Sequence, residues 1–164
     1  MNFTFTPDQT QELPLTVPNF EDARSGFAPY YSSQMTEAEA KADIIAEMGK
    51  VGAGVTRIVD GTFGIGKQKR LGYEVHFLLY GKPGIIRVAG LPIGKTMTER
   101  KREQVKVQAL LNVRDWIKTS ITQQVFSPGL HPLVMKLLAD DGSRTLEEML
   151  VAEDGRLPML EGGI

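Results

Sequence analysis

The chain contains no cysteine, and its only histidines are His76 and His131. Without cysteine, disulfides and zinc sites built on thiolates are excluded. Neither histidine stands in a spacing typical of metal ligands, so we interpret both as ordinary strand or loop residues. We therefore expect no metal site and no bound cofactor.

Long apolar runs are also missing, since none approaches the roughly 20 residues that a membrane-spanning helix needs. The first residues, MNFTFTPDQTQEL, lack the basic start and apolar stretch of a signal peptide. We expect a cytoplasmic protein without a membrane partner.

No catalytic constellation is evident in the sequence. The acidic pairs Asp140–Asp141 and Glu147–Glu148 consist of adjacent residues, whose side chains point in different directions on a helix. This arrangement is typical of surface groups rather than of an acid/base pair. We predict no catalytic residues.

What remains is the composition of an ordinary globular domain, with 41% hydrophobic and 24% charged residues in a chain of 164. Residues 1 to 34 carry prolines and aromatics but no periodic apolar face. They predict an extended arm that docks on its own domain or on a neighbouring subunit. We expect a single α+β domain over 35 to 152 and an irregular tail over 153 to 164. The oligomeric state stays open, a homo-oligomer included.

Local patterns predict the element order of this domain. Thr36 and Glu39 form a capping-box signature for a helix over 36 to 49. The alternating stretches VTRIVDG and GYEVHFLLY, and the turn YGKPG before GIIRVAGLPI, predict a three-stranded antiparallel meander. The stretch GTFGIGKQKRLG between the first two strands is interpreted as a flexible turn or loop. One face of the second strand should be apolar, and comprises Tyr73, Val75, Phe77 and Leu79.

A second capping box, Thr96 with Glu99, predicts a long helix over about 97 to 125. Its apolar stripe, which would bury the single tryptophan, comprises Val105, Ala109, Leu110, Val113, Trp116, Ile117, Ile121 and Val125. Two short C-terminal helices should follow, one from near Pro132 to Gly142 and another capped by Ser143 or Thr145.

The net charge of −1 conceals a basic middle between acidic ends. Such asymmetry can mark a footprint for an anionic partner, or it can pair the ends with the middle inside the fold. At the start of the long helix, Arg100, Lys101 and Arg102 crowd the positive end of the helix dipole. Cations there are unfavourable by a few tenths of a kcal/mol each, which an anionic partner would offset.

DNA or RNA is the partner that this basic middle favours, through its phosphates. The predicted nucleic-acid-binding residues are Lys67, Lys69, Arg70, Lys95, Arg100, Lys101, Arg102 and Lys106. The alternative interpretation is a solvated helix surface, in which Glu99 pairs with Arg102 and Glu103 with Lys106 at i,i+3 spacing.

The stretch AGLPIGKTMTER also fits a loose phosphate-binding loop, with Gly94, Lys95 and Thr96 as alternative nucleotide-binding residues. That reading requires a parallel sheet and a later strand that delivers an acid to magnesium. The YGKPG hairpin indicates an antiparallel sheet instead, and Pro92 removes one backbone donor from the loop. Nucleotide binding therefore stays an alternative to nucleic-acid binding.

The order helix, three antiparallel strands and helix with a basic first turn resembles the double-stranded-RNA-binding domain over residues 36 to 125. GKTMTERKR stands where that family places its glycine and lysine cluster. The resemblance implies phosphate and groove-shape contacts from Lys95, Arg100, Lys101 and Arg102. The second helix is longer than in that family, and the lysine spacing differs.

The runs VRDWIKTSITQQVF and LVMKLLADDGSRTLEEML, after an α-β-β-β core, are similar to small hypothetical proteins of phage and mobile-element genomes. The similarity covers most of residues 36 to 150, and its key positions are Trp116, Asp141, Gly142, Thr145 and Leu146. It carries no activity, but implies roles in phage DNA metabolism or in interference with a host system.

Two functional hypotheses follow beside nucleotide binding. The first is a non-catalytic accessory protein that binds nucleic acid. The second is a protein-interaction module, an inhibitor or an adaptor, whose partner binds the aromatic arm or the acidic ends.

Overall fold

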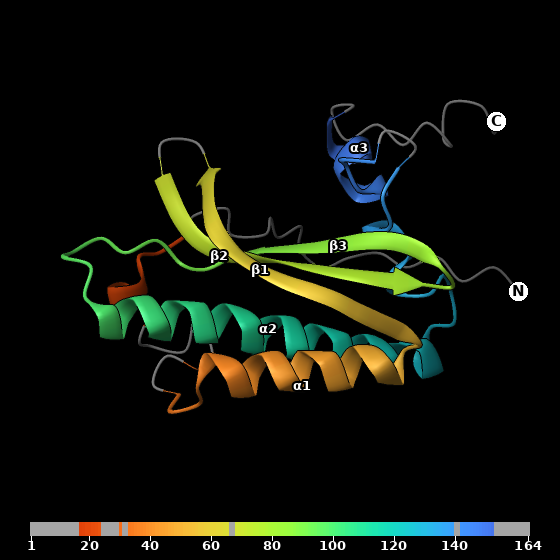
Figure 1. The fold of residues 1–164 in the computed structure, drawn as a ribbon, viewed down its shortest axis with the longest axis horizontal. Coiled ribbons are helices and arrows are strands. Elements are labelled where there is room, and N and C mark those ends of the chain that lie inside the picture. Colours follow the sequence, from red (N-terminus) through yellow and green to blue (C-terminus); the bar gives the residue numbers. More distant parts are fainter. Residues whose placement is uncertain (1–16, 24–29, 31–32, 66–67, 140–141, 153–164) are drawn as a thin grey trace, which may run out of the picture.

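The computed structural model describes residues 17–23, 30, 33–65, 68–139 and 142–152. Its antiparallel sheet has the strand order β1-β2-β3, with β1 at Ala53–Ile65, β2 at Gln68–Leu79 and β3 at Lys82–Ala89. The helices α1 (Glu37–Lys50) and α2 (Glu99–Phe126) pack together on one face of the sheet, and α3 (Leu146–Ala152) lies on the other side (Figure 1). The predicted α+β fold and its element order are confirmed.

The core lies between the sheet and the two long helices. Alternation along β2 directs Tyr73, Val75, Phe77 and Leu79 to this side, and all four are buried as predicted. They meet apolar side chains from both helices, which include Ile44, Met48, Leu110 and Ile117. The face of the sheet that carries these residues is therefore committed to packing, and only the opposite face is left for solvent or a partner.

Of the two predicted helix caps, the one at α1 is confirmed and the one at α2 is wrong. At α1, Glu39 N donates to Thr36 Oγ1 (3.2 Å) and Thr36 N donates to Glu39 Oε2 (2.8 Å), which completes the predicted capping box. The cap of α2 is Thr98 rather than Thr96, since Thr98 Oγ1 accepts from Lys101 N (3.2 Å). The preceding loop is drawn toward the arm by Phe20 N, which donates to Pro92 O (2.7 Å), and the helix begins only after this contact.

The predicted loop GTFGIGKQKRLG is largely strand, which corrects the sequence interpretation. β1 continues to Ile65 and β2 begins at Gln68, with Phe63 directly opposite Arg70. Glycines disfavour strands in isolation. Here Gly72 is needed because the Phe63 ring lies against it, and a Cβ at Gly72 would stand 2.7 Å from Phe63 Cε2. The β1–β2 hairpin therefore extends well beyond the body of the molecule (Figure 1).

The apolar stripe of α2 is correct in its first half and wrong at two positions. Val105, Leu110 and Ile117 are buried. Trp116 retains 38% exposure and Val125 retains 77%. Trp116 precedes Ile117 by one residue, about 100° around the helix, so it turns away when Ile117 faces the sheet.

The segment after α2 is not the helix predicted from Pro132 to Gly142. It contains a single 3-10 turn, Val134–Lys136, and then an extended stretch along the edge of β3, where Leu138 N donates to Pro83 O (3.0 Å). The open hydrogen-bonding edge of β3 outweighs the local helical pattern. Of the two predicted caps for the last helix, Thr145 is used: its Oγ1 accepts from Glu148 N (3.2 Å). Asp140 and Asp141 lie outside the described residues.

Two aromatic residues of the arm are turned inward onto the domain. Phe20 belongs to a 3-10 turn, Phe20–Asp22, where the sequence predicted extended chain, and is 1% exposed against Leu71 and Val105. The Tyr30 hydroxyl donates to Asp115 and accepts from Arg114 Nη2 (2.9 Å). Phe20 and Tyr30 therefore stabilise the fold of their own chain. The rest of the arm's aromatics, and the tail over 153 to 164, lie outside the described residues.

Candidate nucleic-acid interface

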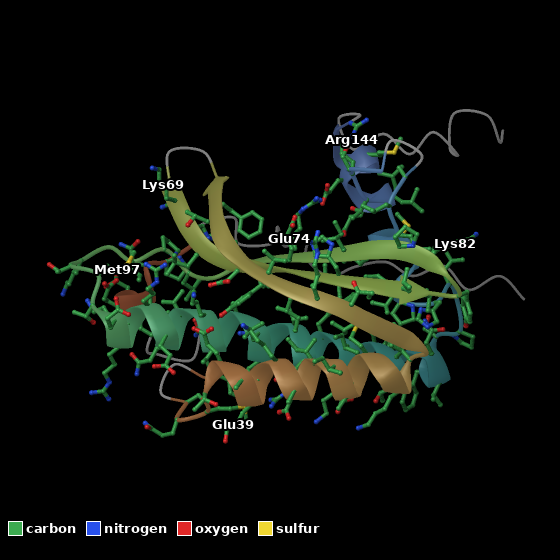
Figure 2. The ribbon with its side chains drawn as sticks, in the orientation of Figure 1. Glu39, Lys69, Glu74, Lys82, Met97 and Arg144 are labelled. Carbon is green, nitrogen blue, oxygen red and sulfur yellow. The ribbon has the colours of Figure 1, made fainter. Side chains whose placement is uncertain are left out.

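The hairpin tip, the loop over 90–98 and the start of α2 lie toward the same end of the molecule, with the tip standing apart from the other two (Figures 1 and 2), and most of the predicted cations lie on these three segments. Lys69 lies near the tip of the hairpin, Lys95 in the loop, and Arg100 and Arg102 in the first turn of α2. All four are exposed. None of them makes an ion pair within the described part of the chain. We call Lys69, Lys95, Arg100 and Arg102 the basic end. Lys67 lies outside the described residues.

The intrahelical pairs of the alternative interpretation are not formed among the described residues. Arg102 has no ion pair with Glu99, and Lys106 turns away from Glu103 toward other carboxylates. The exposed arginines therefore remain at the positive end of the α2 dipole without the intrahelical partners that would offset this cost.

Lys106 is buried and paired with carboxylates inside the fold, so it is not a surface cation. It is 7% exposed, and its Nζ lies 3.0 Å from Asp60 Oδ2 and 3.7 Å from Glu37 Oε1. The hydrogen bond from Lys106 lowers the pKa of the Asp60 carboxyl. Nζ also lies 5.7 Å from the centroid of the Tyr73 ring, in a cation–π contact. This lysine fastens α2 to β1, and we leave it out of the basic end.

Arg70 joins the hairpin to the loop. Its Nε donates to Gly90 O (2.7 Å) and its Nη2 to Ala89 O (3.2 Å). Burial lowers the pKa of this guanidinium, although arginine stays charged in proteins. The contact links the end of β2 that carries Lys69, the preceding residue, to the start of the loop that carries Lys95.

Glu21 occupies the backbone of the phosphate-loop-like stretch. Its carboxylate accepts from Gly94 N (3.0 Å), Lys95 N (3.1 Å) and Lys101 Nζ (3.0 Å). Burial raises the pKa of this carboxyl, but the hydrogen bonds from its own and neighbouring amides and from Lys101 prevail and lower it to about 2. Lys101 also donates to Thr96 O (3.3 Å).

The anion that this loop binds is thus supplied by the chain itself. The amides of Gly94 and Lys95 are the donors that the nucleotide alternative assigns to a phosphate, and they already hold Glu21. The strand before the loop is antiparallel to its neighbour, which is not the setting of a phosphate-binding loop. The geometry gives nucleotide binding at Gly94, Lys95 and Thr96 no support.

Glu21 supplies a test of this geometry by pH. A carboxyl with a lowered pKa stabilises the fold above its ordinary value of 4.5, and that contribution is lost as the pH falls from there toward about 2. We expect Glu21→Gln to lower the free energy of unfolding at pH 7 by about 2 kcal/mol and to flatten this acid-dependent loss. Urea unfolding at pH 7 and about pH 3 measures both. Asp22→Asn, at the exposed neighbouring carboxylate, is the control; equal effects from the two variants would contradict the assignment.

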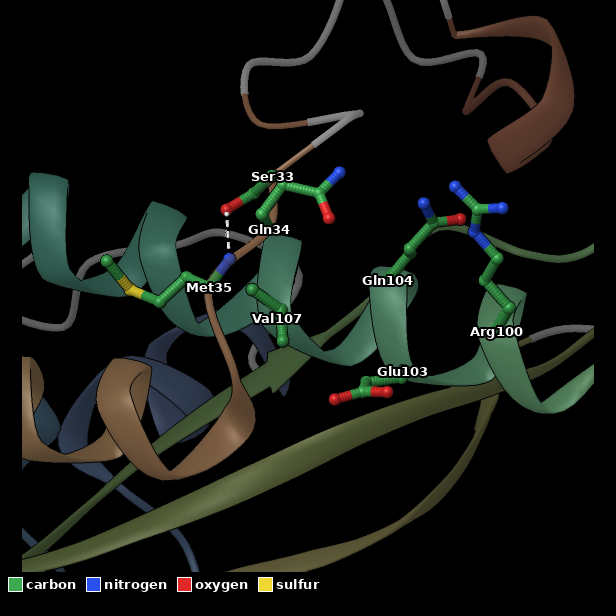
Figure 3. Close-up of a pocket in the computed structure, with 7 residues that line it drawn as sticks. All are labelled: Ser33, Gln34, Met35, Arg100, Glu103, Gln104 and Val107. Carbon is green, nitrogen blue, oxygen red and sulfur yellow. Dashed lines mark hydrogen bonds between the residues drawn. The ribbon is translucent and has the colours of Figure 1, made fainter.

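Arg100 stands at the mouth of a polar hollow of about 240 Å³ between the arm and α2 (Figure 3). Ser33, Gln34 and Met35 form one wall, and the α2 residues Arg100, Glu103, Gln104 and Val107 form the other. The hollow combines one cation, one carboxylate and two side-chain amides. It adds hydrogen-bonding groups beside the basic end.

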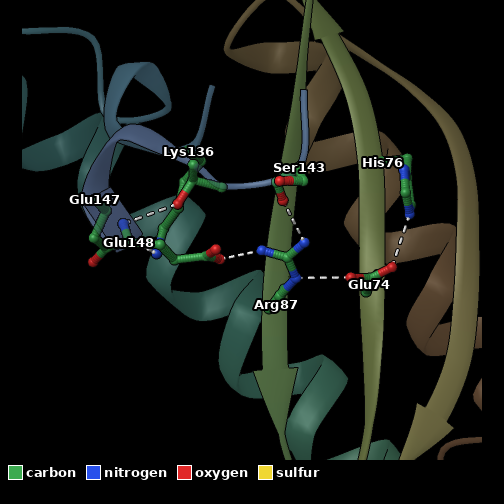
Figure 4. A network of polar contacts seen from close by, with 8 residues as sticks. Glu74, His76, Arg87, Lys136, Ser143, Glu147 and Glu148 are labelled. Carbon is green, nitrogen blue, oxygen red and sulfur yellow. Dashed lines mark hydrogen bonds and ion pairs between the residues drawn. The ribbon is translucent and has the colours of Figure 1, made fainter. Parts of the chain in front are cut away.

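The opposite face of the sheet carries a polar network that sequence reasoning missed (Figure 4). Arg87 on β3 donates to Glu74 Oε2 (2.7 Å), to Ser143 O (3.1 Å) and to Glu148, and so fastens α3 to the sheet. Glu74 Oε1 lies 3.2 Å from His76 Nε2. The hydrogen bond from Arg87 lowers the pKa of Glu74, so this carboxylate is ionised and paired.

Comparisons with known proteins return no family model, no curated protein and no solved structure that matches this chain. Among the helices that the structure describes, none combines the length and apolar character needed to cross a membrane. The function is therefore inferred from the geometry of the chain's own residues.

Proposed function

We propose that the protein is a non-catalytic nucleic-acid-binding accessory protein that contacts phosphates through its basic end. The observation that carries the proposal is that Lys69, Lys95, Arg100 and Arg102 come from three separate elements, share one end, and are exposed without an ion pair in the described part of the chain. Clustered, unneutralised cations are the electrostatic footprint of a polyanion.

Internal contacts support this interpretation by holding the cations in place. Arg70 fixes the hairpin to the loop, and Glu21 with Lys101 fixes the loop to the arm and α2. Arg70, Glu21 and Lys101 are each paired within these contacts. The four cations of the basic end are therefore held in place by the surrounding structure but are not neutralised by it. Backbone phosphates, which are regularly spaced, are the anions that several such side chains can contact together.

Equilibrium binding tests the proposal. The labelled probes are single- and double-stranded DNA and RNA of about 16 nucleotides, a length that matches typical single-strand sites. In low salt we expect a Kd in the micromolar range or tighter for at least one probe, as measured by fluorescence anisotropy. Unchanged anisotropy for every probe up to the highest protein concentration would contradict the proposal.

A further inference from the structure

The face of the sheet that points away from α1 and α2 has its own side chains beside the hairpin. Cross-strand partners share a face, and the pairs opposite to the buried one are Arg57–His76, Val59–Glu74, Gly61–Gly72 and Phe63–Arg70. On β1 this places Arg57, Val59, Gly61 and Phe63 in a row. Val59 retains 40% of its surface exposed, although it is apolar.

Phe63 is held in one position on this face by glycine. A Cβ at Gly72 would lie 2.7 and 2.9 Å from two atoms of the Phe63 ring, so the ring lies against the bare backbone of β2. At Gly61, the residue opposite Gly72, a Cβ would meet nothing within 4 Å. One glycine therefore seats the aromatic ring, and the other leaves open space beside it.

That open space is a hollow of about 240 Å³. Val59 and Glu74 line one side, Phe63 lines the other, and Gly61 lies between them; Asp60, Thr62 and Tyr73 of the same strands complete the lining. The hollow is smaller than the roughly 300–1,000 Å³ of sites for drug-sized ligands, and suits a single planar ring system.

The charges around the hollow suit a polyanion. Arg57 is exposed two residues before Val59 on β1, on the same face of the sheet as Phe63. Arg57 forms no ion pair among the described residues. Both carboxylates of the lining are paired, Glu74 with Arg87 at 2.7 Å and Asp60 with Lys106 at 3.0 Å. An aromatic ring in a hollow beside a cation is an arrangement by which proteins bind single-stranded nucleic acid.

We propose that this hollow receives one unpaired nucleobase, stacked on Phe63, while Arg57 contacts a neighbouring phosphate. The inference rests on the proposed function and narrows its ligand to single strands. In a duplex the bases are stacked on one another and their faces are covered, so they cannot reach Phe63 without being extruded.

Three probes separate the base from the phosphates: labelled oligothymidine, a duplex of the same length, and an abasic strand with the same number of phosphates. We expect the protein to bind oligothymidine about tenfold more tightly than the abasic strand, the scale of one stacked base. Phe63→Leu, which keeps apolar bulk but removes the aromatic face, should abolish this difference.

A second variant and a matched control keep the test independent of folding. Gly61→Val fills the hollow at a position with free space, leaves Phe63 on Gly72, and should also abolish the preference for the base. Phe126→Leu changes an aromatic side chain, 81% exposed, at the other end of α2, and should retain it. Thermal unfolding verifies that each variant is folded.

The outcomes distinguish the two proposals. Equal affinity for all three probes, or a base preference that survives both Phe63→Leu and Gly61→Val, would overturn the base site while the phosphate interface stands. Binding to none of the probes in low salt would overturn the proposed function, and the base site with it.

Discussion

Reversing Arg100 and Arg102 together to glutamate is expected to weaken binding to single-stranded nucleic acid about 25-fold or more near 0.1 M salt. For a single strand each phosphate contact contributes about 0.7 logarithmic units of affinity at this ionic strength through counterion release, and two contacts are removed. Both side chains are exposed and unpaired in the described structure, so the reversal should leave stability nearly unchanged. Fluorescence anisotropy measures the affinity, and thermal unfolding measures the stability.

The matched control is the double variant Lys82→Glu/Lys118→Glu, which changes the net charge equally. Both lysines are exposed, and Lys82 lies at the β2–β3 turn, far from Lys69 (Figure 2). We expect this variant to retain binding within a few-fold, because only the general field changes. Equal losses from the two double variants would show that net charge, and not the basic end, determines affinity.

Gly72→Ala should give the largest loss of stability among single substitutions in the hairpin, about 3 kcal/mol in the free energy of unfolding. The added Cβ would lie 2.1 Å from Val88 O on the neighbouring strand and 2.7 Å from the Phe63 ring. A backbone carbonyl cannot move aside as a flexible side chain does, so β2 and β3 must separate locally. Thermal unfolding should show a decrease in Tm of about 10 °C.

Gly54→Ala provides the comparison in the same sheet. Gly54 lies on β1, and a Cβ there meets nothing within 4 Å. We expect a change of less than about 1 kcal/mol, since the site has room and ordinary strand conformation. If both alanine variants unfold at the same temperature, the close contact of Phe63 and Val88 with Gly72 is not as described.

Much of the fold was predictable because local signals agree with the packing. The Thr36–Glu39 capping box fixes the start of α1, and the alternation from Tyr73 to Leu79 identifies the buried face of β2. The length of the hairpin was not predictable. Its glycines weaken the strand signal locally, and their reason, the Phe63 ring on Gly72, is a contact between strands.

The positive charge of the candidate site could be predicted from the sequence, but its geometry could not. Residue types identify the basic middle of the chain, yet Lys101 and Lys106 turn to Glu21 and Asp60, which are distant in sequence. Arg57 and Phe63 carry no local signal at all. They become recognisable only when the strand register places them on one face, beside Gly61. The hydrogen bonds from Gly94 N and Lys95 N to the Glu21 carboxylate are likewise tertiary contacts, which no loop motif reveals.

The central claim is that phosphates bind the basic end, and its most direct test is the dependence of the binding constant on salt. If Lys69, Lys95, Arg100 and Arg102 each contact one phosphate, log K against log salt concentration should have a slope of about −3 for a single strand. Arg100→Glu/Arg102→Glu should reduce the magnitude of this slope by about half. A slope near zero, or a slope that the double variant leaves unchanged, would contradict the account.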